Sequence, residues 1–267
     1  MRHGQRATPA TGCNDVDMSE MTTPAPLEPL NEDWERALAI VAHPDDLEFG
    51  AAAAIARWTG QGKRIVYVLL TSGEAGIDGI PPEQCGPLRE QEQRAAAAVV
   101  GVDEVEFAGF PDGVLEYGLP LRKAVARAVR RHRPEVVITS NVRDTWDDAT
   151  ALNQADHIAT GRAVLDGVRD AGNRWVFTDL LAEGLEPWNK VREIWAANSP
   201  RARHGVDVTD TFDKGVASLR AHEQYLAGLG SGTFDPEEFL ESVCRQAGSR
   251  LGCRYAVPFE VFPLQTF

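Results

Sequence analysis

The chain has 267 residues, a formal net charge of -13 and 43% hydrophobic residues. This much apolar material can fill a core, which excludes an intrinsically disordered protein. The scattered negative charge repels phosphate backbones and anionic lipid surfaces, so neither nucleic acid nor a membrane is an expected partner. No apolar run approaches the roughly 20 residues that cross a bilayer, and residues 1–21 lack the apolar block of a secretion signal, which predicts a cytoplasmic protein.

The first 30 residues are rich in Thr, Pro, Ala and Glu and show no apolar periodicity. We predict that residues 1–30 are a disordered tail outside the fold. The length of the remainder suits one large domain, so residues 31–267 are predicted to form a single α/β domain.

Apolar runs alternate with helical patterns along the next part of the chain. The predicted order is strand 37–42, helix 47–61, strand 64–70, helix 88–100, strand 105–107, helix 121–133, strand 136–140 and helix 155–171. Fully apolar strands that alternate with helices are typical of a mostly parallel sheet with helices on both faces. The rest is less regular: strands are predicted at 191–197 and 206–209, helices at 212–226 and 236–247, and a loose apolar end at 255–262.

The sequence His43-Pro44-Asp45-Asp46 directly follows the first strand. Ligands of open parallel sheets bind at the carboxyl ends of the strands, where this cluster lies. Imidazole and carboxylate are ordinary ligands of Zn²⁺. Pro44 suits the first turn of a helix, so His43 projects from the strand end and the two aspartates project from the helix start. One aspartate can therefore bind the metal while the other faces the open coordination position. Alternatively, the aspartates only stabilise a helix dipole at about 0.3–1 kcal/mol each, which leaves His43 unexplained.

A second histidine, His157, follows the strand 136–140 and also leaves the carboxyl edge of the sheet. His43, Asp46 and His157 are therefore predicted to bind one Zn²⁺ and to leave a position open for catalysis. Asp156 is predicted to support a neighbouring group by a hydrogen bond. The hypothesis requires that the donor atoms lie within roughly 5 Å of one another, because metal–ligand bonds are near 2 Å.

These residues resemble the PIG-L and LmbE-like deacetylases, which remove acetyl groups from N-acetylglucosaminyl compounds. The resemblance covers about Trp34 to Leu226, and its AHPDD element is specific. It is carried by AHPDDLEFG at 42–50, TSGEAG at 71–76, Arg89 with 91–101, FPDG at 110–113, VVITS at 136–140 and ADH at 155–157, with weaker echoes in 203–209 and 214–224. The resemblance implies a Rossmann-like sheet, the same three metal ligands, and Asp45 as the general base.

One position departs from the family pattern. Many members carry a histidine three residues before the last metal ligand, where it stabilises the oxyanion, and this chain has Gln154. Glutamine donates a neutral hydrogen bond but supplies no positive charge. Gln154 therefore plays a reduced form of that role, another group such as His204 or His222 replaces it, or the enzyme is slow or altered.

Three residues in the family-like motifs are predicted to bind substrate: Glu74, Arg89 and Asp112. Alternatively, Arg89 is a surface residue paired with Glu90 or Glu92, and Asp112 only starts a turn. Trp146 either lines the mouth of the site or packs in its loop.

The sequence as a whole predicts a zinc-dependent amidohydrolase that removes an acetyl or other acyl group from an N-acetylglucosaminyl-type or related small substrate. The family resemblance also allows a homo-oligomer. A nucleotide-binding module is disfavoured, because no GxGxxG follows the first strand. The remaining alternative is a catalytically weak or inactive metal-binding member of the same fold.

Overall fold

The computed structural model describes residues 25–146, 151–229 and 234–264. Within these residues, eight strands form one open sheet in the order β1-β7-β8-β6-β5-β2-β3-β4. The strands are β1 Glu28–Pro29, β2 Arg36–Val41, β3 Arg64–Leu69, β4 Glu104–Phe107, β5 Val136–Thr139, β6 Glu193–Ala197, β7 His204–Asp207 and β8 Ala256–Pro263. Only β8 runs antiparallel to its neighbours β6 and β7, so the predicted mostly parallel sheet is confirmed.

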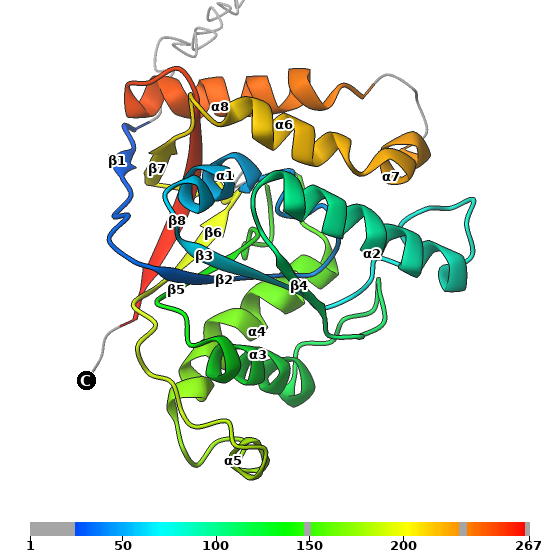
Figure 1. Cartoon of the computed structure of the whole chain (residues 1–267), viewed down its shortest axis with the longest axis vertical. Coiled ribbons are helices and arrows are strands. Elements are labelled where there is room, and N and C mark those ends of the chain that lie inside the picture. Colours follow the sequence, from blue (N-terminus) through cyan, green and yellow to red (C-terminus); the bar gives the residue numbers. More distant parts are fainter. Residues whose placement is uncertain (1–24, 147–150, 230–233, 265–267) are drawn as a thin grey trace, which may run out of the picture.

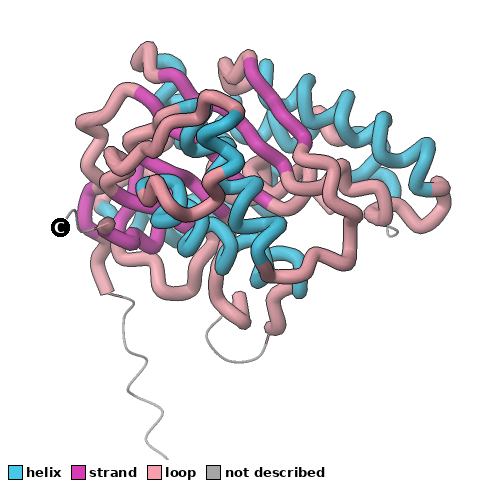
Figure 2. The backbone as a smooth tube through the Cα atoms, turned by 90° about the horizontal axis from the view of Figure 1, so that it is seen from below, coloured by secondary structure: helices cyan, strands magenta, loops and turns pink. Residues whose placement is uncertain are grey.

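Helices cover both faces of this sheet (Figures 1 and 2). They are α1 Ala52–Gly60, α2 Pro82–Val99, α3 Leu119–His132, α4 Ala155–Gly172, α5 Asp179–Ala182, α6 Phe212–Arg220, α7 Glu223–Gly228 and α8 Pro236–Leu251. In Figure 1, α1, α2, α6 and α8 lie on one side of the strands, and α3, α4 and α5 lie on the other. None of these helices has the length and apolarity that a bilayer crossing needs, within the part of the chain that the structure describes.

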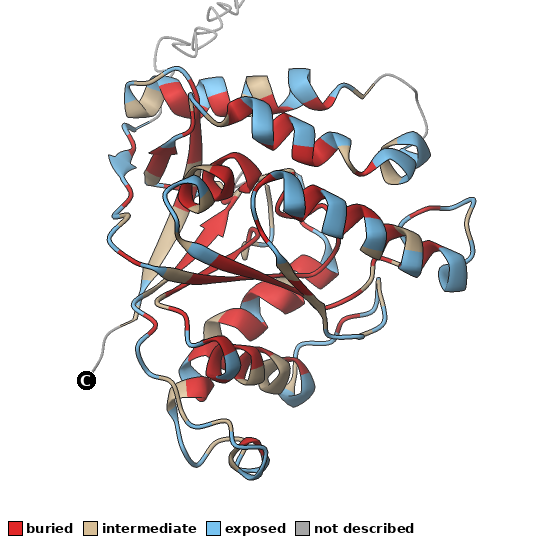
Figure 3. Ribbon diagram, in the orientation of Figure 1, coloured by how far each residue is buried: buried red, intermediate tan, exposed pale blue. Residues whose placement is uncertain are grey.

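The period of two along a strand divides the core into two layers. In β2, Ala37, Ala39 and Val41 pack into the cluster under α1 and α6, whereas Leu38 and Ile40 pack into the cluster against α3 and α4. Both sets are buried, which explains why the strand reads as a continuous apolar run. Figure 3 shows the helices with buried inner faces and exposed outer faces.

Several boundaries differ from the prediction: α1 begins at Ala52 and not at residue 47, the helix predicted at 212–226 is divided into α6 and α7, and β7 begins at His204. The tail prediction for residues 1–30 is wrong for its last part, because β1 pairs with β7 and the Leu27 and Leu30 side chains are buried; residues 1–24 lie outside the described residues. Helix α2 begins at Pro82, with Pro87 inside it. The apolar end at 255–262 is a strand, β8.

Candidate active site

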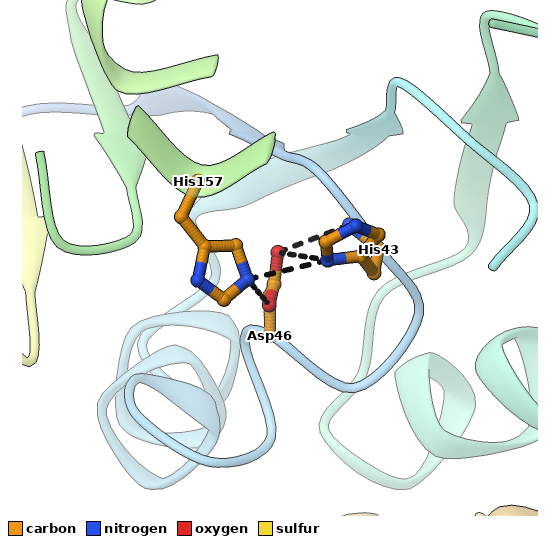
Figure 4. Close-up of side chains that lie close together, drawn as sticks. All are labelled: His43, Asp46 and His157. Carbon is orange, nitrogen blue, oxygen red and sulfur yellow. Dashed lines mark hydrogen bonds and ion pairs between the residues drawn. The ribbon is translucent and has the colours of Figure 1, made fainter. Parts of the chain in front are cut away.

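The candidate site lies where two neighbouring parallel strands end. His43 and Asp46 follow β2, and His157 lies in the first turn of α4, in the segment after β5. Strands β2 and β5 are neighbours in the sheet, so their carboxyl ends meet at one edge. Figure 4 shows the three side chains directed toward one another.

The donor atoms of these three residues lie within 4.8 Å of one another. His157 Nε2 is 2.9 Å from Asp46 Oδ1 and 3.2 Å from His43 Nδ1. All three residues are buried and line one cavity. The spacing meets the requirement for sharing a single cation, since metal–ligand bonds near 2 Å place ligand atoms a few ångströms apart.

Hydrogen bonds fix which nitrogen of His43 faces the other two residues. His43 Nε2 is 3.1 Å from Asp112 Oδ1 and 3.3 Å from Asp156 Oδ2. Carboxylates only accept, so Nε2 carries the hydrogen and Nδ1 keeps its lone pair. The Asp156 carboxylate is itself held by the backbone N–H groups of Gly113 and Leu115 at 2.8 and 3.0 Å.

The tautomer of His157 follows in the same way from Asn153. Asn153 Nδ2 donates to the carbonyl oxygens of Asn141 and Arg143 at 3.0 and 2.9 Å, so its Oδ1 is the acceptor that faces His157 Nδ1 at 2.9 Å. His157 Nδ1 therefore carries the hydrogen, and Nε2 keeps its lone pair. Two imidazole lone pairs and the Asp46 carboxylate thus converge with no donor between them, which is the arrangement that a cation satisfies.

The surrounding charges favour a cation at this point as well. Burial lowers the pKa of His43, but hydrogen bonds to Asp112, Asp156 and Asp46 outweigh burial and raise that pKa to about 12. Burial raises the pKa of Asp46, but the charges and hydrogen bonds of His157 and His43 outweigh it and hold the pKa well below its ordinary value. The three carboxylates thus favour a positive charge at this point, either a second proton on His43 Nδ1 or a metal cation that would replace that proton.

Asp45 points to a different set of partners. Its carboxylate accepts from Arg89 Nη2 at 2.7 Å, and its backbone N–H donates to Gln93 Oε1 at 2.8 Å. Its φ of 88° is uncommon for a residue other than glycine and turns the chain sharply between the two aspartates. Burial raises the pKa of Asp45 more than Arg89 lowers it, and the net result is about 7.

Two glycines of the TSGEAG segment allow Arg89 to reach Asp45. A Cβ atom at Gly73 or Gly76 would lie 2.3 or 2.2 Å from Arg89 Nη1, which is closer than any carbon atom can approach. Arg89 Nη1 donates to the Gly73 carbonyl at 3.0 Å, and its guanidinium lies over the Tyr225 ring at 4.2 Å. The surface alternative for Arg89 is wrong, because this side chain is buried and its ion pair is with Asp45.

The other two residues predicted to bind substrate have different surroundings. Asp112 lines the cavity, with one carboxylate oxygen on His43 and the other accepting from the backbone N–H of Ala75 at 2.9 Å. Glu74 is not among the described residues that line the cavity, and its carboxylate accepts from the Asp112 backbone N–H at 2.9 Å. Trp146 lines the cavity, and its ring meets that of His157 at 5.6 Å between centroids.

Gln154 is exposed and lines the cavity. His204 and His222 are not among the described lining residues. His204 lies on β7 with Nε2 3.7 Å from Glu28, and the fully buried His222 has Nε2 3.5 Å from Glu48. Of the three groups considered for the oxyanion role, Gln154 alone reaches the cavity.

Three supporting residues were not predicted from the sequence: Asn153, Gln93 and Tyr225. Asn153 precedes His157 by four residues, and Gln93 follows Arg89 by four residues on α2. Residues four apart are neighbours on a helix surface, so this spacing was a usable signal for Gln93. Tyr225 lies in α7, and nothing local to the sequence links that helix to Arg89, over whose guanidinium its ring packs.

An open, mostly parallel sheet that gathers two imidazoles and a carboxylate at its carboxyl edge defines an α/β protein with a group that can bind a metal ion. Residues 38–168 match the family model of PIG-L, the GlcNAc-PI de-N-acetylases, and this part of the chain is a PIG-L family domain. The resemblance predicted from the motifs is thus confirmed.

The curated relatives include the diacetylchitobiose deacetylase of Thermococcus kodakarensis. It is 28% identical over 242 residues, which cover 88% of this chain and 86% of the relative. A solved structure of the N,N'-diacetylchitobiose deacetylase from Pyrococcus horikoshii aligns with a TM-score of 0.75 and 24% identity, and covers 86% of this chain and 85% of that one. The 4-carboxy-2-hydroxymuconate hydratase of Pseudomonas putida aligns with a TM-score of 0.69 and 21% identity, over 87% and 98% of the two chains. The two structural likenesses show the shared fold alone.

Proposed function

We propose that this protein is a zinc-dependent hydrolase that removes the acetyl group from the amide nitrogen of an N-acetylglucosaminyl-type or related small substrate. The observation that carries the proposal is the convergence of three acceptor groups, from His43, Asp46 and His157, beside a fourth group, Asp45, that is held apart from them. The deacetylase relative supports the choice of reaction.

The residues present suit a zinc ion. His43, Asp46 and His157 would hold it, because two imidazoles and one carboxylate with a cavity beside them match catalytic zinc sites. When bound, zinc lowers the pKa of water toward neutrality and polarises an amide carbonyl. Asp112 and Asp156 fix the tautomer and orientation of His43, and Asn153 does the same for His157.

Asp45 is the proposed general base. Its carboxylate takes a proton from the water that attacks the amide carbon, and gives a proton to the amine as the carbon–nitrogen bond breaks. Amide and water thereby become acetate and a free amine. Arg89 and Gln93 hold Asp45 in its unusual backbone conformation, so their proposed role is positioning.

Gln154 is proposed to donate a hydrogen bond from its side-chain N–H to the developing oxyanion. Unlike a histidine, it supplies no positive charge there. Asp112 faces the cavity and is proposed to contact substrate in addition to holding His43. Glu74 is proposed to support the Asp112 backbone in place of direct substrate contact.

Metal analysis combined with an assay for released amine tests this function. The purified chain is expected to bind about one zinc ion at the proposed site and to release amine from N-acetylglucosamine or N,N'-diacetylchitobiose, and chelation is expected to abolish turnover. Bound zinc without turnover on any N-acyl amino sugar would instead support the alternative, a catalytically weak or inactive metal-binding member.

The fit of Arg89 against Gly76 gives a separate prediction. In Gly76→Ala the new methyl group displaces the guanidinium, because a Cβ at this position would lie 2.2 Å from Arg89 Nη1. We expect kcat to fall by about 10- to 100-fold through displacement of Asp45. Gly79→Ala is the matched control, since a Cβ at Gly79 meets nothing within 4 Å. Equal activity of the two variants would show that Arg89 does not position the base.

A further inference from the structure

The cavity that begins at the metal-ligand group extends along one face of α8. Four side chains of this helix line the cavity at intervals of four, three and four residues: Phe239, Val243, Gln246 and Arg250. Residues at these intervals share one face of a helix, and eleven residues at 1.5 Å each span about 16 Å. The adjacent face of α8 belongs to the core, through Leu240, Cys244 and Ala247. Helix α8 therefore uses one face for folding and presents a second face to the cavity.

The first two residues of this cavity-facing stripe of α8, Phe239 and Val243, are apolar. Phe239 is 38% exposed although it is a large hydrophobic residue. Its ring meets that of Phe49 at 5.6 Å between centroids, and Phe49 lines the cavity three residues after Asp46. Both aromatic side chains line the same cavity as the metal-ligand group, and both also contact the Phe234 ring, at 5.8 Å for Phe49 and 5.6 Å for Phe239 between centroids. Val243 continues the apolar wall one turn further along α8.

The far end of the stripe is polar and rigidly held. Arg250 Nε donates to the Ala25 carbonyl at 2.9 Å, and Nη2 donates to the Ala202 carbonyl at 3.0 Å. The cavity volume of about 950 Å³ lies at the upper end of the range of roughly 300–1,000 Å³ for small-molecule sites. The cavity therefore has room for more than an N-acetyl amino sugar alone.

From this geometry we infer that the substrate is an N-acyl amino sugar that carries an apolar substituent, an alkyl or aryl aglycone, which packs on Phe49, Phe239 and Val243. This inference rests on the proposed function and specifies its substrate class. A substituent in this position buries apolar surface of the ligand and of the protein, and the binding free energy becomes more favourable in proportion to the area removed from water.

Two synthetic glycosides that differ only in the aglycone test the inference: methyl and octyl N-acetyl-β-glucosaminide, both used below the concentration at which the octyl compound forms micelles. We expect kcat/KM for the octyl glycoside to exceed that for the methyl glycoside by about tenfold or more, since each fully buried methylene group adds about fourfold. Equal values would overturn the inference and leave the proposed deacetylation intact.

Substitutions on α8 test whether the preference for the octyl glycoside arises from the cavity-facing residues of this helix. In Phe239→Ala and in the nearly isosteric Val243→Thr, the octyl-to-methyl ratio is expected to fall to below about threefold. Trp175→Ala is the control, because this exposed aromatic residue is not among the described lining residues and the ratio is expected to stay at its starting value. A ratio that survives both α8 substitutions would show that the aglycone binds elsewhere.

Binding of octyl β-glucoside, which has no acyl group, separates this inference from the proposed function. Calorimetric titration is expected to show a dissociation constant that rises at least about fivefold in Phe239→Ala. If the zinc-loaded protein cleaves neither glycoside but binds octyl glucoside in this way, the proposed function fails and the apolar subsite stands. If octyl glucoside does not bind, or binds the variant equally well, the apolar subsite is wrong.

Discussion

Asp45→Asn is expected to lower kcat by about 10²- to 10⁴-fold, the usual contribution of a general acid–base group, while the protein keeps its zinc. Asparagine has the shape of aspartate but takes no proton at neutral pH. The metal stays because the Asp45 carboxylate lies on Arg89, at 2.7 Å, and is not part of the His43, Asp46 and His157 group. Steady-state kinetics together with metal analysis on the same preparation measures both effects.

The same substitution affects stability, because it leaves the buried Arg89 guanidinium without its counter-charge. Removing one partner of a buried ion pair usually costs about 3–5 kcal/mol of unfolding free energy. We expect a smaller loss here, because burial already raises the pKa of Asp45 to about 7 and so favours a neutral side chain at this position. The double variant Asp45→Asn with Arg89→Met removes both charges and is expected to regain most of this stability, but none of the activity. Urea unfolding measures the first quantity and amine release the second. Loss of zinc from Asp45→Asn would show that Asp45 helps to bind the metal, and would contradict the proposal that Asp46 is the metal ligand and Asp45 the general base.

The sequence indicated the position of the site because the relevant signals are local. An apolar run ends at His43, another ends before the segment that leads to His157, and parallel strands end at one edge of a sheet. The three residues could therefore be brought together without coordinates. The tautomers of the two histidines could not be predicted. They depend on Asp112 and Asp156, which hold His43, and on the backbone carbonyls of the segment between β5 and α4 that orient Asn153.

Elements that depend on distant partners were harder to predict. Strand β1 has only two residues and forms by pairing with β7. Strand β8 pairs antiparallel with both β6 and β7, and no local sequence pattern specifies that pairing. Helix α2 was predicted at residues 88–100, but it begins at Pro82 and contains Pro87, although proline inside a helix removes a backbone hydrogen bond. The helix tolerates it one turn after a start at Pro82, where a proline is favoured.

The prediction for Glu74 as a substrate ligand shows a further limit of sequence motifs. A polar residue in a loop after a strand can face the cavity or face a neighbouring loop, and the sequence does not distinguish the two. Glu74 faces the loop that carries Asp112, and accepts its backbone N–H. Arg89 shows the opposite case, since the glycines at 73 and 76 leave the space that its guanidinium fills.

His157→Ala is expected to abolish zinc-dependent stabilisation of the fold as well as turnover. Zinc that binds only the folded protein raises the unfolding free energy of the wild type by about 2.7 kcal/mol at a free concentration one hundred times its dissociation constant. Without His157 two donors remain, and thermal unfolding with and without zinc is expected to show no difference. Asn153→Ala removes only the partner that orients His157, so zinc affinity is expected to fall by about 10- to 100-fold.

His204→Ala is the matched control and is expected to keep the full response to zinc. His204 lies 3.7 Å from Glu28 and is not among the described residues that line the cavity. A zinc response that persists in His157→Ala would place the metal elsewhere, because the geometry that unites the three acceptors requires this imidazole.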